Sequence, residues 1–144
     1  MGFAVMMSFM LLTNCSRSKS VVSTSANENM QSSEYQLSGD CALLHIYRPG
    51  SMKGMAISYD VYLGDDVIYR AKNKSKTTLR ITGEGQIMLW AKTETRAELP
   101  VDIRLGNEYY IQCGIGFGAL VGRPRLEIVD NKKGKDEFSK IPSN

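Results

Sequence analysis

The sequence predicts an all-β fold, an antiparallel β-sandwich of seven to eight strands. Three observations predict it. Short runs of β-branched and aromatic residues recur between residues 41 and 130, turn residues separate these runs, and no run has the amphipathic helical pattern that a βαβ fold requires. The chain has 144 residues, 42% of them hydrophobic, and a net charge of +3. These values exclude a disordered acidic chain, a polytopic membrane protein and a strongly basic nucleic-acid binder, so no nucleic-acid partner is expected.

The first strands are delimited by turn signals. Residues 41–48 (CALLHIYR) form an apolar run that ends at a Pro-Gly pair, a strong turn signal. Residues 57–63 alternate apolar and polar side chains, which is the pattern of a half-buried strand. A Gly-Asp-Asp turn then leads into residues 67–70, so these two runs are expected to form a hairpin.

The middle strands include one with an edge signal. A short run at 77–81 precedes a Gly-Glu-Gly segment, and residues 86–93 (QIMLWAKT) form the most apolar run and contain the only tryptophan. Residues 99–105 alternate most regularly. Pro100 in this run donates no ladder hydrogen bond, so we expect the strand to lie at an edge or to begin irregularly.

Two strands and a short helical turn complete the domain. A Gly-Asn turn leads into residues 108–115, and residues 125–130 give the last strand. Tyr109 and Tyr110 are expected to point to opposite faces, because side chains alternate along a strand. The tail GKDEFSKI predicts one short helical turn.

The N-terminal residues predict a targeting signal rather than a folded element. Residues 1–14 (MGFAVMMSFMLLTN) contain no charge. They are too few to span a bilayer, which needs about 20 residues, but they fit the apolar region of a signal peptide, about 7–15 residues. The segment Leu12-Thr13-Asn14-Cys15 resembles the bacterial lipobox, which implies cleavage before Cys15 and lipidation of its thiol. Another export signal or a buried N-terminal strand are the alternatives.

The expected lipid anchor also predicts a location and a tether. Several acyl chains on Cys15 would hold the protein firmly to a membrane, whereas one chain would not. Ser16 stands where the resemblance would place an aspartate for inner-membrane retention, which favours the outer membrane of a bacterial envelope, facing the periplasm or the cell surface. Residues 15–38 are rich in serine and predict a flexible tether with a span of roughly 25 Å. The sandwich domain is expected over residues 39–144.

Three landmarks in the domain carry a family resemblance. They are IYRP at 46–49, VYLGD at 61–65 and LGNEYYI at 105–111. In this order they resemble the family called domain of unknown function 2846, often found on bacterial lipoproteins, and Gly85 with the strand after it adds a fourth element. The similarity covers roughly residues 41–138. It implies a small sandwich of the transthyretin-like or Ig-like kind with no assigned catalytic residues.

The cysteines and the only histidine do not form a catalytic pair of nucleophile and base. Cys41 and Cys113 remain once Cys15 is acylated, and in an oxidising compartment they either form a disulfide or stay as two buried thiols. His45 lies four residues after Cys41, roughly 13 Å along a strand, too far for proton transfer. A histidine with a local partner is therefore favoured over a catalytic pair. Arg48 is expected to meet a carboxylate such as Asp60.

The carboxylates also lack a catalytic arrangement. Asp65 and Asp66 are adjacent in a turn, where solvated carboxylates favour hairpin geometry. A calcium site that combines them with Asp60 is the alternative, although calcium needs six to eight oxygen ligands. We expect no metal, no cofactor and no catalytic residues.

The clearest candidate for a contact lies in the glycine-rich segment 114–122 (GIGFGALVG). A dinucleotide loop would have to open a helix, and a strand follows too soon, so a loop or bulged hairpin is predicted. Phe117, Leu120 and Val121 would form an apolar tip that an envelope protein or a glycan could contact. The cationic stretch 70–80 is expected to be a solvated turn, with attraction to anionic lipid or polysaccharide as the alternative.

These observations predict a membrane-anchored envelope lipoprotein whose non-catalytic sandwich binds or supports a partner. The alternative is a periplasmic enzyme or enzyme inhibitor with a site formed by loops. The oligomeric state, the ligand and the physiological process stay open.

Overall fold

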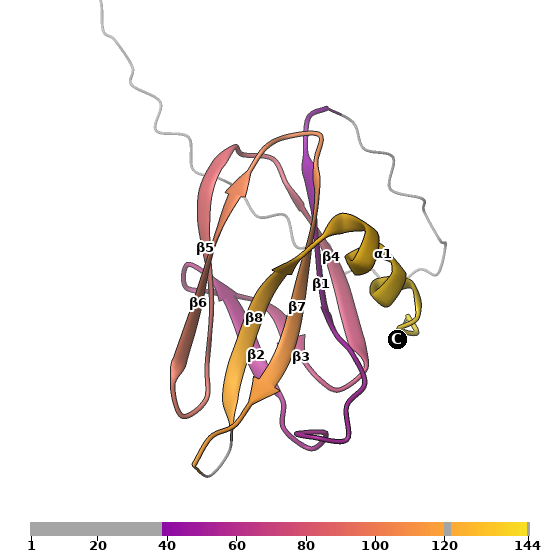
Figure 1. Cartoon of the computed structure of the whole chain (residues 1–144). Helices are drawn as coiled ribbons and strands as arrows, with labels where there is room; N and C mark the ends of the chain where they lie inside the picture. The colour runs from indigo at the N-terminus through magenta and orange to yellow at the C-terminus, as the bar shows by residue number, and fades with distance from the viewer. Residues whose placement is uncertain (1–38, 120–121, 144) are drawn as a thin grey trace, which may run out of the picture.

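The computed structural model describes residues 39–119 and 122–143, which form two facing β-sheets and one short helix (Figure 1). The expected signal peptide, the tether with Cys15, and the loop residues Leu120 and Val121 lie outside the described residues. The predicted all-β sandwich is confirmed, with eight strands and a helix. In chain order these are β1 (Ala42–Arg48), β2 (Tyr59–Leu63), β3 (Asp66–Ala71), β4 (Ser75–Ile81), β5 (Gly85–Lys92), β6 (Arg96–Ile103), β7 (Glu108–Gly116), β8 (Arg123–Val129) and α1 (Asn131–Ser139).

The two sheets have the strand orders β4-β1-β7-β8 and β3-β2-β5-β6. Their strands pair antiparallel with one exception, β1 and β7, which run parallel with Ile46 opposite Ile111. Among the described strands, the β1–β7 pair is thus the one departure from the predicted antiparallel arrangement. β1 and β7 are separated by five other strands, and only such a long connection allows two neighbours to run in the same direction.

The core lies between the sheets and is built from the alternate, inward-facing residues of each strand. The largest fully buried aliphatic side chains are Leu44, Ile46, Val61, Leu89, Val101, Ile103 and Ile111. Pro100 occupies an outward position on β6, which is an edge strand as its sequence predicts. No helix within the described ranges is long and apolar enough to cross a membrane.

Helix α1 covers the outer face of β1 and β7 (Figure 1). It is longer than the single turn expected, and Asp130 caps it by accepting hydrogen bonds from the backbone N–H groups of Lys132 and Lys133. A second apolar cluster lies beneath it, consisting of Tyr47, Tyr110, Val129, Phe138 and Ile141. Tyr110 belongs to this cluster whereas Tyr109 packs against the core between the sheets, so the predicted opposite orientation of the two tyrosines is confirmed.

Candidate functional site

Four connections meet at one end of the sandwich, the lower end in Figure 1, which we call the loop end. It consists of residues 49–58, 72–74, 93–95 and 117–122, without the two undescribed positions. Contacts between the loops define it: the Ser51 N–H donates to Asn73 Oδ1 at 2.9 Å, and the Thr93 hydroxyl donates to the Gly122 carbonyl at 2.6 Å. Segments that are far apart in the sequence thus lie together on one surface of the fold.

Large apolar side chains are exposed at the loop end. Met52 is 90% exposed, Phe117 83% and Met55 56%. The sequence predicts an apolar tip with Phe117, Leu120 and Val121; Phe117 is exposed in the β7–β8 loop, and the other two lie outside the described residues. Sequence reasoning missed the two methionines. A signal was present, since both follow a strong Pro-Gly turn, Met52 between Gly50 and Gly54 and Met55 directly after Gly54.

Arg48 holds the loop that presents these methionines. Its side chain is buried, with the residue 2% exposed, at the end of β1. Its guanidinium donates to three carbonyl oxygens: Nη1 to Ile57 at 2.6 Å and to Ala71 at 2.9 Å, and Nη2 to Gly54 at 2.7 Å. The expected pairing with Asp60 is wrong, because backbone carbonyls occupy the donors of Arg48.

Backbone geometry gives the same loop a second constraint. Gly54 has φ +70°, a conformation that favours glycine, and a Cβ there would lie 3.1 Å from Cβ of Ile115. Its carbonyl oxygen also accepts the Ile57 N–H at 3.0 Å. The loop is therefore closed against β7 and held in one shape, although it exposes Met52 and Met55.

The β5–β6 turn supports the second loop. Glu94 Oε2 accepts the backbone N–H of Ala119 at 2.9 Å, and the Thr93 hydroxyl is bound to Gly122 as described above. Phe117 lies next to the first loop, because Lys53 Nζ is 2.9 Å from the centroid of its ring. This cation–π contact joins the two loops that carry the exposed apolar side chains.

The two ends of the sandwich differ in charge. The connections at the loop end contain Lys53, Lys72 and Lys74 against one acid, Glu94. The connections at the opposite end show the reverse, with one cation, Arg104, against four acids: Asp40, Asp65, Glu84 and Asp130. Three of the cations predicted to form a solvated turn in 70–80 lie elsewhere: Arg70 pairs with Asp60, Lys76 contacts Phe138 and Arg80 contacts Cys41.

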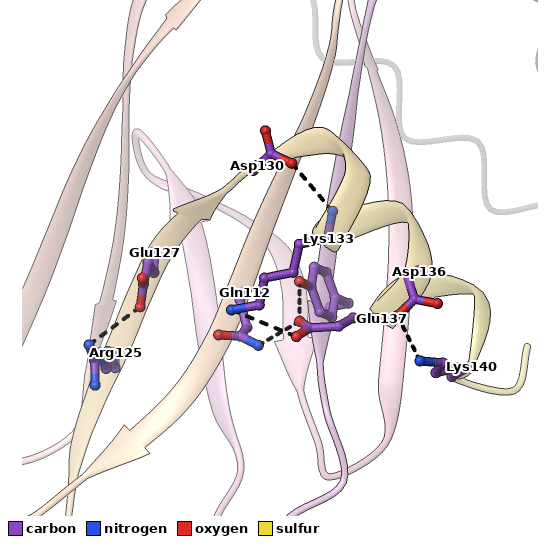
Figure 2. Close-up of polar contacts among 9 residues, drawn as sticks. Gln112, Arg125, Glu127, Asp130, Lys133, Asp136, Glu137 and Lys140 are labelled. Atoms are coloured by element: carbon purple, nitrogen blue, oxygen red, sulfur yellow. Dashed lines mark hydrogen bonds and ion pairs between the residues drawn. The ribbon is translucent and has the colours of Figure 1, made fainter.

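A polar pocket of about 250 Å³ adjoins the loop end on the outer face of β7 and β8. Ser51 and Lys53 line one side, and Gln112, Arg125 and Glu127 line the other. Arg125 lies 3.4 Å from Glu127 (Figure 2). The wall of the pocket thus contains an exposed ion pair.

Glu137 is the point where several polar side chains converge near this pocket. Its Oε2 accepts hydrogen bonds from the Tyr47 hydroxyl at 2.7 Å and from Gln112 Nε2 at 2.8 Å (Figure 2). Burial and the carboxylate of Glu137 raise the pKa of Tyr47 above its ordinary value, so the phenol stays a donor. Lys133 lies 3.8 Å from the other oxygen. The arrangement joins α1 to β1 and β7, which is a structural role.

His45 has the local partner that its sequence context predicts. Its Nδ1 is 2.8 Å from the Thr78 hydroxyl, and its ring stacks on Tyr110 with centroids 4.6 Å apart. Nε2 is buried and has no hydrogen-bond partner in the described part of the chain. Burial lowers the pKa of His45, with an opposing contribution from Glu108 and a further lowering by Lys135. Burial beneath α1 therefore favours the neutral form of the imidazole.

Cys41 and Cys113 are both buried, and no disulfide joins them. Of the two alternatives, the disulfide is wrong. In the parallel register of β1 and β7, Leu43 pairs with Glu108 and Tyr47 pairs with Gln112. Cys41 precedes the first of these pairs and Cys113 follows the last, so the two cysteines lie at opposite ends of the paired segment. The two cysteines are therefore roughly 20 Å apart along the sheet, whereas a disulfide needs Cα atoms within about 7 Å. Burial raises the pKa of the Cys113 thiol to about 12.

The outer face of the other sheet carries an aromatic pair. Tyr62 and Trp90 stack with centroids 4.0 Å apart, and the Arg96 guanidinium lies over the Trp90 ring, 4.2 Å from its centroid. These contacts join β2, β5 and β6 across the outer face of the sheet.

The carboxylates considered for calcium are apart. Asp60 pairs with Arg70 at 3.3 Å, whereas Asp65 and Asp66 lie in and after the turn at the far end of the β2–β3 hairpin. Within residues 39–119 and 122–143, no group of three or more His, Cys, Asp or Glu side chains is placed to hold a metal ion.

Together the fold and the loop end define an eight-stranded β-sandwich with exposed apolar and cationic side chains at one end. No protein-family model, curated protein or solved structure matches the chain. The resemblance to the domain of unknown function 2846 family thus stays a prediction.

Proposed function

We propose that the protein is a bacterial envelope lipoprotein, anchored through Cys15, whose sandwich is a non-catalytic binding module that acts through the loop end. The observation that carries the binding role is the exposure of Met52 and Phe117 on loops that Arg48 and Glu94 hold in place. Large apolar side chains on a rigid scaffold are typical of contact surfaces. The anchor rests on the Leu12–Cys15 segment and the serine-rich stretch after it.

A binding role also agrees with how the polar side chains are used. Glu137, Gln112 and Tyr47 converge, but their hydrogen bonds attach α1 to the sheet. His45 is covered by Phe138 and Tyr110. The histidine, tyrosine and glutamate side chains considered for catalysis are thus engaged in packing, whereas the exposed side chains at the loop end are mostly apolar or cationic, with Glu94 as the one acid. Contact with a partner is the role that such groups serve best.

Metabolic labelling with a palmitate analogue tests the anchor. We expect the full chain to incorporate the label when it is expressed in a bacterium, and a Cys15→Ala chain to incorporate none. Cys113→Ala is the matched control, because Cys113 is buried in the core and is expected to leave the label unchanged. A Cys15→Ala chain that is labelled like the wild type would refute the proposal.

A further inference from the structure

We propose that the loop end docks on an anionic phospholipid surface, with Met52, Met55 and Phe117 entering the interface and the neighbouring lysines meeting the headgroups. This inference deepens the proposed function, since it names what the loop end contacts. Its docking step does not require the anchor, so the two ideas can fail separately.

The apolar part of the surface has the composition of an interfacial contact. Met52, Met55 and Phe117 are all more than half exposed, and they project from two adjoining loops. Transfer of such side chains from water to the boundary between headgroups and acyl chains is favourable. Lys53 extends over the Phe117 ring, so its ammonium group can stay at headgroup level while the ring goes deeper.

Charge complementarity selects an anionic surface. Lys53, Lys72 and Lys74 lie in the loops, and Lys92 and Arg123 lie at the strand ends beside them. The one acid in these loops, Glu94, accepts the Ala119 N–H. Lysine and arginine side chains close to an anionic membrane are attracted to its headgroups.

The acidic opposite end orients the domain. Asp40, Asp65 and Glu84 lie in connections at that end, and a negative surface repels them. The charge separation along the strands therefore favours one orientation, with the loop end toward the lipid and the acidic end away from it.

The described domain begins at Gly39, at the acidic end (Figure 1). An anchored protein must therefore have enough chain to bring its loop end back to the membrane. The sandwich is about 30 Å long, as the nine residues of β7 indicate. Residues 15–38 can reach up to about 80 Å when fully extended. Docking on the membrane that holds the anchor is then an intramolecular event. The tether gives the loop end a high effective concentration at the membrane, so even a weak contact is formed much of the time.

The first loop loses little conformational freedom on docking. Two hydrogen bonds from Arg48, to the carbonyl oxygens of Gly54 and Ile57, hold this loop, and Gly54 packs against Ile115. A surface that is already ordered retains more of its interaction free energy as affinity. A rigid apolar and cationic surface is therefore suited to repeated, reversible contact with lipid.

Vesicle cosedimentation tests the inference with the full chain carrying Cys15→Ser, expressed without lipidation. The vesicles are phosphatidylcholine alone, or phosphatidylcholine mixed in equal parts with phosphatidylglycerol. We expect binding to the mixed vesicles and little to phosphatidylcholine. Met52→Ser/Phe117→Ser and Lys53→Glu/Lys74→Glu should each weaken it about tenfold or more. The matched control is Val67→Ser/Met88→Ser, which removes two exposed apolar side chains from the outer face of the other sheet and should change binding less than about twofold.

Equal binding to both kinds of vesicle would overturn the inference, as would loop-end variants that bind like the control. If that happens while Cys15 is labelled in the wild type, the anchor stands and the loop end contacts something other than lipid, such as an acidic protein. If vesicles bind but Cys15 takes no label, docking stands without the anchor.

Discussion

Arg48 binds the loop that follows it: its Nη2 donates a hydrogen bond of 2.7 Å to the carbonyl oxygen of Gly54, six residues later. The same guanidinium reaches Ile57 and Ala71, so one buried cation joins the end of β1, the loop 49–58 and the end of β3. The position of the exposed methionines thus depends on a side chain that is itself inaccessible.

Replacing this side chain should destabilise the domain. We expect Arg48→Met to lower the free energy of unfolding by about 3 kcal/mol or more, because carbonyl oxygens that are now bonded would be left without a donor. Arg70→Met is the matched control, and its exposed pair with Asp60 should contribute less than about 1 kcal/mol. Urea unfolding measures both. An Arg48→Met protein as stable as the control would contradict the role given to this residue.

The buried histidine should make stability depend on pH. Burial lowers the pKa of His45 in the folded state, so the unfolded chain takes up its proton first as the pH falls. The contribution of the neutral His45 to the free energy of unfolding should therefore be fully present above about pH 7. It should decrease as the pH falls below about 6.5, the ordinary pKa of histidine, until the pKa of the folded state is reached. Urea unfolding of wild type and His45→Phe, between about pH 7.5 and pH 5.5, measures this. A decrease of equal size in both proteins would assign it to other groups.

The buried thiols should be inert in the folded protein. The pKa of Cys113 is raised to about 12, so almost no thiolate exists at neutral pH. We expect the Cys15→Ser chain to show no alkylation by iodoacetamide under native conditions, modification of both cysteines in denaturant, and an unchanged mass after reduction. A mass increase on reduction would show that the two thiols had been bonded.

Glu137 should fix α1 on the sheet. Tyr47→Phe removes one of its donors and is expected to lower the free energy of unfolding by about 1 kcal/mol. Asp136→Ala removes the exposed pair with Lys140 on the same helix and should cost less than about 0.5 kcal/mol. Guanidinium denaturation can resolve the difference. Equal effects of the two substitutions would show that the Tyr47–Glu137 contact does not hold the helix.

The strands could be predicted from sequence because their signals are local. The alternation at 57–63 and the Pro-Gly pair after Arg48 need only neighbouring residues, and β1 and β2 lie within the predicted runs, whereas β6 begins three residues before the run predicted at 99–105. Pro100 even predicts an edge strand, because the missing N–H is a property of one residue.

The features that were missed depend on distant pairing. The parallel register of β1 and β7 separates Cys41 from Cys113, and no pattern near either cysteine reveals it. Arg48 was expected to find a carboxylate, but its acceptors are backbone carbonyls, which every residue has and no sequence letter marks. The loop end is assembled from separate loops, so the sequence predicts only the tip with Phe117, Leu120 and Val121 and not the methionines of the first loop, which lie beside Phe117 in the fold.

The position of the loop end relative to lipid tests the central claim most directly. An environment-sensitive fluorophore would be attached at Met52→Cys, or at Asp65→Cys on the opposite end, in the Cys15→Ser chain whose remaining cysteines are buried. With vesicles containing phosphatidylglycerol, we predict a blue shift and quenching by lipid-borne quenchers for the label at position 52 and neither for the label at position 65. Equal responses at both positions, or none at position 52, would contradict the account.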